Sequence, residues 1–378
     1  MEQVFNYIFA IMFPFGQDGW KVLSLVSVIF AIKYFNVWKK DNIVLSLFIF
    51  LFYGLVLTLF SPNIGTSFKE LQNYFVGWLF PFLLGYSVSD KEQKLKILKI
   101  YLVFFSLTIV VGFLAYFNVI SDKFYNTDLM FYDRLAVFCW HTIFAGRCSF
   151  VLIILLVLFL FKDSNKKSKL IILFGILFYS FALFLSGTRS CFISVSFVFI
   201  LVLLFYFYKR KKILNGMILF ILISILLVSI YHLNPYLKNR IQNTNLTNDN
   251  AIVERIDMYK NGINLLKKPK IFGYAPGISI TKGNNIHNMG HFHNSFLQIV
   301  LEFGLVGFIL FCTILFFIFK RLFLLYKNTG SVFYLMLIFA WCSIFISEQF
   351  DCMLRAPFFA AQYFWITGLI IGKEKDKE

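Results

Sequence analysis

The feature that most constrains this chain is a succession of apolar segments, each about as long as a bilayer is thick. A helix needs about 20 mostly apolar residues to cross the hydrocarbon. With 59% hydrophobic and 15% charged residues, the 378-residue chain has more apolar surface than a water-soluble core could hide. Helices satisfy their own backbone polar groups, whereas the alternating short strands of a membrane barrel do not occur in the sequence. We therefore expect an all-α polytopic membrane protein.

The apolar runs predict about 12 transmembrane helices, of which the first is short. They cover residues 4–15, 20–37, 43–60, 73–89, 97–118, 135–161, 170–186, 191–208, 213–231, 296–319, 331–347 and 356–371. One long hydrophilic segment separates the ninth run from the tenth. The chain is thus expected to consist of transmembrane helices 1–9 (1–231), a loop domain (232–295), and transmembrane helices 10–12 with a tail (296–378).

Lysine and arginine clusters follow every second apolar run, and this alternation predicts an orientation. Basic residues gather on the cytoplasmic side of membrane proteins. The clusters are Lys39-Lys40, Lys91–Lys99, Lys162–Lys169, Lys209–Lys212, Lys320–Lys327 and Lys373–Lys377. Both termini are then cytoplasmic, and the loops 16–19, 61–72, 119–134, 186–190, 232–295 and 348–355 face outward. This topology accounts for the net charge of +17, so we expect no nucleic-acid partner.

The 232–295 loop carries signals of ordered structure. Asp249 or Asn250 can cap a helix that extends to Lys268 and stops before Pro269. Its apolar residues recur at helical spacing and predict one stripe for packing: Ile252, Ile256, Tyr259, Ile263 and Leu266. The passage that follows, from residue 271 to 277, contains two glycines and a proline. We expect these glycines to allow a close approach between backbones.

Five arginines fall on the outward side of this topology: Arg134, Arg147, Arg189, Arg255 and Arg355. A charge at or below the membrane surface is costly unless it has a partner or lines a polar cavity. A single arginine can simply snorkel to lipid headgroups. Five on one face, with few carboxylates around them, favour an anionic ligand instead. Guanidinium groups bind phosphate oxygens in a bidentate manner, which suits a diphosphate.

A candidate base, His293, stands where the polar loop runs into an apolar helix. Its imidazole can accept a proton from a sugar hydroxyl near neutral pH, although it could also be a hydrogen-bonded histidine at a helix start. His287, His291 and His293 could instead share a metal ion. No carboxylate accompanies them nearby in the sequence and no Asp-x-Asp motif occurs, so we predict neither metal nor cofactor. Glu302 lies deeper in the helix, where we expect a buried, hydrogen-bonded or protonated packing residue.

Three motifs occur in an order that resembles a known family. The first is the Ser-Gly-Thr-Arg189-Ser turn, and the second is Glu254-Arg255-Ile-Asp-Met-Tyr followed by Lys-Pro-Lys-Ile-Phe-Gly-Tyr-Ala-Pro-Gly. The third is His293-Asn294, nine residues, and then Gly304-x-x-Gly307. Over roughly residues 130–360 the chain resembles the bacterial O-antigen ligases and the related O-antigen polymerases.

The resemblance implies a GT-C-like glycosyltransferase of the bacterial inner membrane with a periplasmic active site. The donor would be a glycan on undecaprenyl diphosphate and the acceptor a sugar hydroxyl of the lipid A core, without metal or nucleotide. By motif position, Arg189 and Arg255 would bind the diphosphate, and His293 would activate or orient the acceptor hydroxyl. From their outward position alone, Arg134, Arg147 and Arg355 are further candidates for diphosphate binding.

Fixed cations can stabilise a diphosphate leaving group, so the acceptor needs only a base and correct placement. A single displacement would invert the anomeric centre. Two other functions stay open on the sequence. One is an O-antigen polymerase, which joins two lipid-linked repeat units. The other is a non-enzymatic lipid-linked oligosaccharide flippase, which the missing inverted repeat disfavours.

Overall fold

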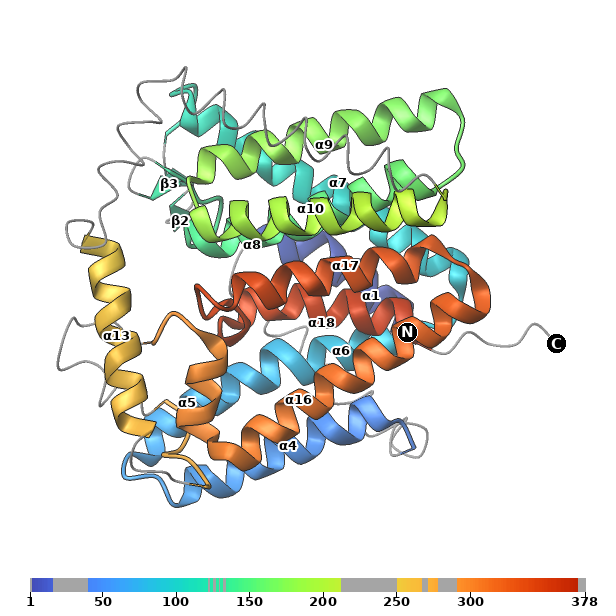
Figure 1. The fold of residues 1–378 in the computed structure, drawn as a ribbon. Helices are drawn as coiled ribbons and strands as arrows, with labels where there is room; N and C mark the ends of the chain where they lie inside the picture. The colour runs from blue at the N-terminus through green and yellow to red at the C-terminus, as the bar shows by residue number, and fades with distance from the viewer. Residues whose placement is uncertain are drawn as a thin grey trace.

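The computed structural model describes residues 2–15, 40–121, 123–124, 127–128, 130–131, 134–211, 250–266, 271–277 and 291–372. Long helices lie side by side in a bundle, and one helix crosses its end (Figure 1). The first half contains α1 (Glu2–Met12), η1 (Phe13–Phe15), α4 (Asn42–Leu59), α5 (Ile64–Tyr74), the π-helical turn η2 (Phe75–Leu79), α6 (Phe80–Tyr86) and α7 (Lys91–Tyr116). The helices that follow are α8 (His141–Phe161), α9 (Lys166–Ser186), α10 (Arg189–Lys209), α13 (Asn250–Leu266), α16 (Ser295–Thr329), α17 (Val332–Ser347), η3 (Met353–Arg355) and α18 (Pro357–Ile371).

The helices confirm a polytopic membrane protein. Six described helices, α4, α7, α8, α9, α10 and α16, are long and apolar enough to cross a bilayer, and three shorter apolar helices accompany them. Every predicted run except two coincides with a helix. The exceptions, 20–37 and 213–231, lie outside the described residues, so the number of spans stays a prediction.

The predicted run 135–161 becomes helical only at His141, so its first residues were wrongly assigned to a span. Two short antiparallel hairpins precede it, β1 (Lys123–Phe124) with β2 (Thr127–Asp128) and β3 (Met130–Phe131) with β4 (Arg134–Leu135). Val137 and Phe138 then adopt positive φ, 39° and 61°, which no helix permits. Leu135 and Val137 are apolar because they are buried over Gly112 of α7.

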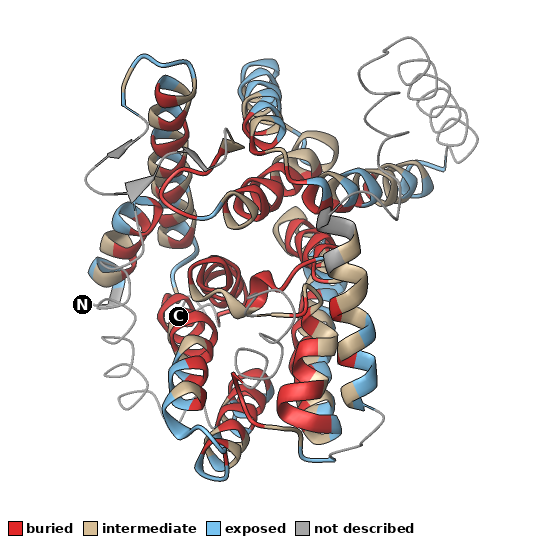
Figure 2. Ribbon diagram, turned by 90° about the vertical axis from the view of Figure 1, so that its left-hand side faces the viewer, coloured by how far each residue is buried: buried red, intermediate tan, exposed pale blue. Residues whose placement is uncertain are grey.

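The core of the bundle is built on α18, which packs closely against α6. Figure 2 shows that buried residues concentrate on the inner helices, and almost the whole of α18 is buried. A Cβ on Gly85 would lie 2.2 Å from the Trp365 oxygen, and one on Gly368 would lie 2.1 Å from the Phe82 oxygen. These glycines let the two backbones touch, as small residues do between membrane helices. By contrast, only 22% of the apolar window of α9 is buried inside the protein.

Helix α16 is interrupted at Gly304, where φ is 70° and ψ is −172°. The segment 271–277 docks into this break: Tyr274 N donates to Leu301 O and Ala275 N to Glu302 O, both at 2.9 Å. Gly273 and Gly304 meet backbone to backbone, since a Cβ on either would lie 2.3 Å from the other's nitrogen. The docked segment therefore satisfies carbonyl groups that the break leaves without helical partners. The predicted close approach of the glycines is confirmed.

Helix α13 crosses the end of the bundle, and its packing face coincides only in part with the predicted stripe, of which Tyr259 contacts the bundle through its hydroxyl. Two members of the stripe are largely exposed, Ile263 at 53% and Leu266 at 36%, whereas Met258 is buried. A Cβ on Gly262 would lie 2.7 Å from Leu297 Cδ2, so this glycine marks the contact with α16. The apolar spacing misled the prediction because a glycine adds no hydrophobicity while permitting the closest approach. The Ile252 side chain lies outside the described residues.

Candidate functional site

Two loops meet under α13 and form the base of a candidate site. The first is residues 291–294, before α16, and the second is residues 348–352, after α17. The Tyr259 hydroxyl of α13 lies 3.0 Å from both the His293 and the Gln349 carbonyl oxygens. Asn294 Nδ2 also donates to Gln349 O at 3.2 Å. One helix thus fixes two segments that are distant in the sequence.

His293 is held in an uncommon backbone conformation directly before α16. Its φ is 50°, in the left-handed region that non-glycine residues rarely adopt. The next residue, Asn294, caps the helix by accepting a hydrogen bond from Leu297 N at 2.9 Å. Strained residues persist only where their surroundings determine them, and they cluster at functional sites. This geometry aims the imidazole at the 348–352 loop rather than along the helix.

Asp351 lies opposite the two histidines and is almost fully buried. Its Oδ1 is 3.4 Å from His293 Nδ1 and 3.7 Å from His291 Nε2. Burial alone would raise the pKa of Asp351, but the two imidazoles outweigh it and hold that pKa well below its ordinary range. Burial lowers the pKa of His291, so this ring is mainly neutral at neutral pH. If His293 turns its Nδ1 hydrogen to the carboxylate, its Nε2 is the basic nitrogen.

His291, His293 and Asp351 also have the composition of a metal site. Their three ligand atoms all lie within 4.8 Å of one another. Two imidazoles and a carboxylate are donors that Zn²⁺ accepts. The sequence argument that no carboxylate accompanies the histidines is wrong in space, because Asp351 reaches them from another loop. The set could therefore hold a metal, and independence from metal stays a prediction. His287 lies outside the described residues.

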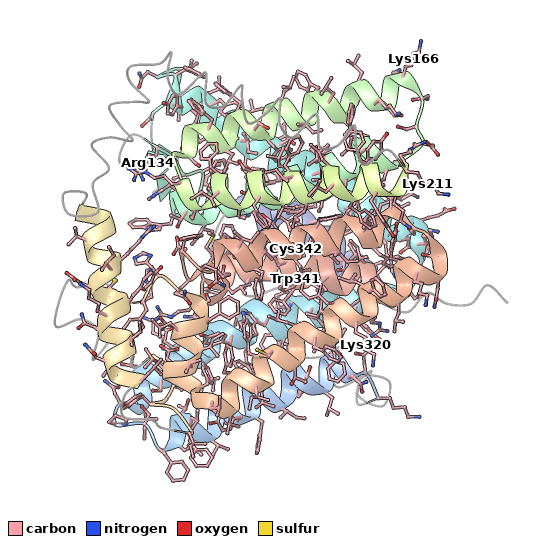
Figure 3. The ribbon with its side chains drawn as sticks, viewed as in Figure 1. Arg134, Lys166, Lys211, Lys320, Trp341 and Cys342 are labelled. Carbon is pink, nitrogen blue, oxygen red and sulfur yellow. The ribbon has the colours of Figure 1, made fainter. Side chains whose placement is uncertain are left out.

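Arg134 and His141 form a second polar pair beside the start of α10. Arg134 Nη1 lies 3.2 Å from His141 Nε2, and Asp351 is near enough to His141 to interact with it electrostatically. The Arg134 side chain rests on Gly187, in the turn just before Arg189. Arg189 is exposed at the first position of α10. Figure 3 shows Arg134 at the end of the bundle that α13 crosses.

Arg255 lies on α13, the helix that covers the two loops of the site. It is half-buried one turn before Tyr259 and interacts electrostatically with that side chain. Tyr259 in turn contacts the His293 carbonyl. Arg134 and Arg255 are thus linked to the histidine group through His141 and Tyr259, and Arg189 follows the Gly187 turn on which Arg134 rests.

The other two predicted arginines are engaged inside the protein. Arg147 is fully buried: its Nε donates to Gln362 Oε1 at 2.9 Å. Three aromatic rings, of Phe13, Phe105 and Phe358, surround its guanidinium at 4.4–4.9 Å. A role for Arg147 at the diphosphate would require this enclosure to open.

Arg355 joins the 348–355 loop to α5 through a bidentate ion pair with Glu70, at 2.9 and 2.7 Å. Burial alone would lower the pKa of Arg355, but Glu302 and Glu70 raise it, so the charge is permanent. Glu302 is fully buried and accepts from Gln298 Nε2 at 2.6 Å, which confirms it as a buried, hydrogen-bonded packing residue. Both arginines are thus held by the fold, and a role in binding diphosphate stays a prediction for each.

Sequence reasoning missed Asp351 and His141. Asp351 lies in the predicted outward loop 348–355, and its charge there was the available signal, whereas His141 falls inside the predicted apolar run 135–161. Neither is close in sequence to His293, so only the packing of α8 and α17 against each other and the docking of α13 reveal the group. A charged residue in a short outward loop, such as Asp351, is as good a candidate for the site as the histidines.

The fold and the site define a class: a polytopic helical membrane protein with a cluster of histidines, a carboxylate and arginines at one end of its bundle. Residues 174–312 match the family model described as O-antigen ligase. The match spans Arg189, Arg255, His293 and Gly304. Members of the family are glycosyltransferase-like enzymes. No curated protein matches the chain significantly.

Proposed function

We propose that this protein is an O-antigen ligase, which transfers a glycan from undecaprenyl diphosphate to a sugar hydroxyl of the lipid A core. The observation that carries the proposal is the pair formed by His293 and Asp351, bordered by arginines, within a region of the O-antigen ligase family. The transfer takes place at the periplasmic face of the inner membrane, with both termini cytoplasmic. The positions of the basic clusters support this orientation.

In this proposal the arginines bind the diphosphate of the donor. Arg189 and Arg255, joined by Arg134, bind the diphosphate and stabilise the charge that develops as the glycosidic bond breaks. Guanidinium groups suit this task because they stay charged and match two phosphate oxygens at once. Strong acid catalysis at the leaving group is then unnecessary.

In this proposal His293 activates the acceptor hydroxyl. Nε2 of His293 accepts the proton of the attacking hydroxyl, and Asp351 orients the ring and stabilises the imidazolium that forms. General base catalysis of this kind contributes about 10²–10⁴ in rate. A direct attack inverts the anomeric centre. Since any sugar hydroxyl could be activated in this way, the geometry fits a polymerase acceptor as well as a lipid A core.

The experiment is transfer by the purified protein in detergent. Defined undecaprenyl-diphosphate glycan is supplied with either lipid A core or a second lipid-linked unit as the acceptor. The ligase proposal expects product on the lipid A core, with inverted linkage by NMR. Product only on the second lipid-linked unit would replace the ligase by a polymerase. Donor movement across proteoliposomes without any transfer would replace it by a flippase.

A further inference from the structure

A cavity of about 340 Å³ lies at the end of the bundle away from α13. It opens between the start of α4 and the C-terminal part of α16, and Lys320 on its wall lies at the opposite end from Arg134 (Figure 3). Its polar lining comprises Lys40, Asp41, Asn42, Lys320, Arg321 and Asn328. Its apolar lining comprises Ile43, Phe317, Leu324 and Leu325. The cavity is therefore amphipathic and separate from the histidines.

The charge of this cavity is positive because its one carboxylate among the lining residues is already engaged. Asp41 forms an ion pair with Arg321, and the Tyr86 hydroxyl donates to it at 2.6 Å. Burial alone would raise the pKa of Asp41, but Tyr86 and Arg321 outweigh it and lower that pKa. Lys40 and Lys320 are exposed at the rim. Their charges are left to attract an anion.

Apolar side chains continue from the cavity along the outer faces of both helices. Phe316 and Leu324 stand one turn on either side of Lys320 and are 58% and 45% exposed. On α4, Leu45 and Ile49 are each 45% exposed on the face that begins with Asn42. A free anion would use only the lysines. A molecule with a charged head and hydrocarbon chains would use both surfaces.

We propose that this cavity binds the phosphate headgroup of an anionic phospholipid. Lys40 and Lys320 contact the phosphate, and the acyl chains lie along Phe316 of α16 and Leu45 and Ile49 of α4. Basic pockets between membrane helices at the bilayer surface are suited to such headgroups. Arg321, held by Asp41, forms the fixed rear wall. The site is independent of the proposed transfer reaction.

Native mass spectrometry of the purified protein tests this, using phosphatidylglycerol and phosphatidylcholine with identical acyl chains. We expect phosphatidylglycerol to bind about 25-fold more tightly. The double variant Lys40→Gln/Lys320→Gln should lose this preference, by about fivefold for each lysine removed. The matched control is Lys166→Gln/Lys167→Gln, which removes two exposed lysines at the start of α9, away from the cavity. This control should keep the preference.

Four results would overturn the proposal. Equal binding of the two lipids by the unmodified protein excludes an anionic headgroup site, and an equal loss in the control pair indicates diffuse attraction. Displacement of phosphatidylglycerol by millimolar inorganic phosphate indicates a free-anion site. A Lys320→Arg variant keeps the charge and should keep the preference for phosphatidylglycerol. A loss of the preference in this variant would show that it depends on the shape of the cavity wall and not on the charge at position 320.

Discussion

The two ends of the bundle use charge in opposite ways. At the histidine end, which holds His291, His293, Asp351 and α13, charges are enclosed and paired by groups from distant segments. At the lysine end, the lysines Lys40, Lys166, Lys211 and Lys320 are exposed on flexible side chains, beside the single enclosed pair of Asp41 with Arg321 described above. Enclosed charges are held in fixed positions, which suits chemistry. Exposed lysines provide attraction without precise placement, which suits orientation and lipid binding.

The helices that connect the two ends allow matched comparisons, because one positive-φ glycine, Gly304, interrupts α16 and another, Gly330, caps its end. Gly304 → Ala places a Cβ 2.3 Å from Gly273 N and should cost about 3 kcal/mol or more in unfolding free energy, with loss of transfer. Gly330, at the lysine end, has φ of 64° and open space around it, so Gly330→Ala should cost only about 1–2 kcal/mol. Thermal unfolding of both variants measures the difference, and equal costs would mean that the docked segment does not matter.

Asp351→Asn keeps the shape of the histidine end but removes its charge. We expect kcat for transfer to fall about 10²-fold or more with little change in the KM for the donor, because the imidazolium loses its counter-charge. The pH dependence of kcat should shift as well, and Asp351→Glu should recover part of the rate. If the variant changes only thermal stability and leaves the pH profile intact, Asp351 is structural.

Arg189 and Arg210 stand at opposite ends of α10 and form another matched pair. Arg189→Lys keeps the charge but loses the fork that matches a diphosphate, so the KM for the donor should rise about tenfold. Arg210→Lys should leave it unchanged. Steady-state transfer at varied donor concentration measures both, and equal behaviour would favour simple snorkelling of Arg189 to headgroups.

Glu348 makes the histidine end sensitive to pH. Burial raises its pKa from 4.5 to about 8, so the folded protein holds it protonated. Its contribution to stability is complete below pH 4.5 and is lost as pH rises through about 8. Glu348→Gln mimics the neutral form, so its unfolding temperature should vary less over this window than that of the unmodified protein. An unchanged pH profile of unfolding would assign the dependence to another group.

Metal removal should have the smallest effect. We expect transfer to be the same with and without EDTA, because the arginines rather than a metal neutralise the leaving group. Restoration of a lost rate by Zn²⁺ or Mn²⁺ would assign His291, His293 and Asp351 to a metal site instead.

The parts of this molecule that could be predicted from the sequence depend on local patterns. Apolar length predicted the described helices, and the motifs predicted the match of residues 174–312 to the O-antigen ligase family model. The roles of Arg189 and His293 stay predictions. The pairing of Asp351 with His293 depends on two loops far apart in the chain, so no local pattern contains it. The packing face of α13 was predicted only in part: the stripe contained Tyr259 but not Gly262, whose close contact with Leu297 adds no apolar residue to the pattern.

In the proposed mechanism, His293 accepts the proton of the acceptor hydroxyl while the arginines bind the donor. The most direct measurement is donor binding and single-turnover transfer on the same preparation of His293→Ala, with His291→Ala as its neighbour control. We predict that His293→Ala binds the undecaprenyl-diphosphate glycan as tightly as the unmodified protein and transfers it about 10³-fold more slowly. The His291→Ala loss should be far smaller. Unimpaired transfer by His293→Ala would contradict the account.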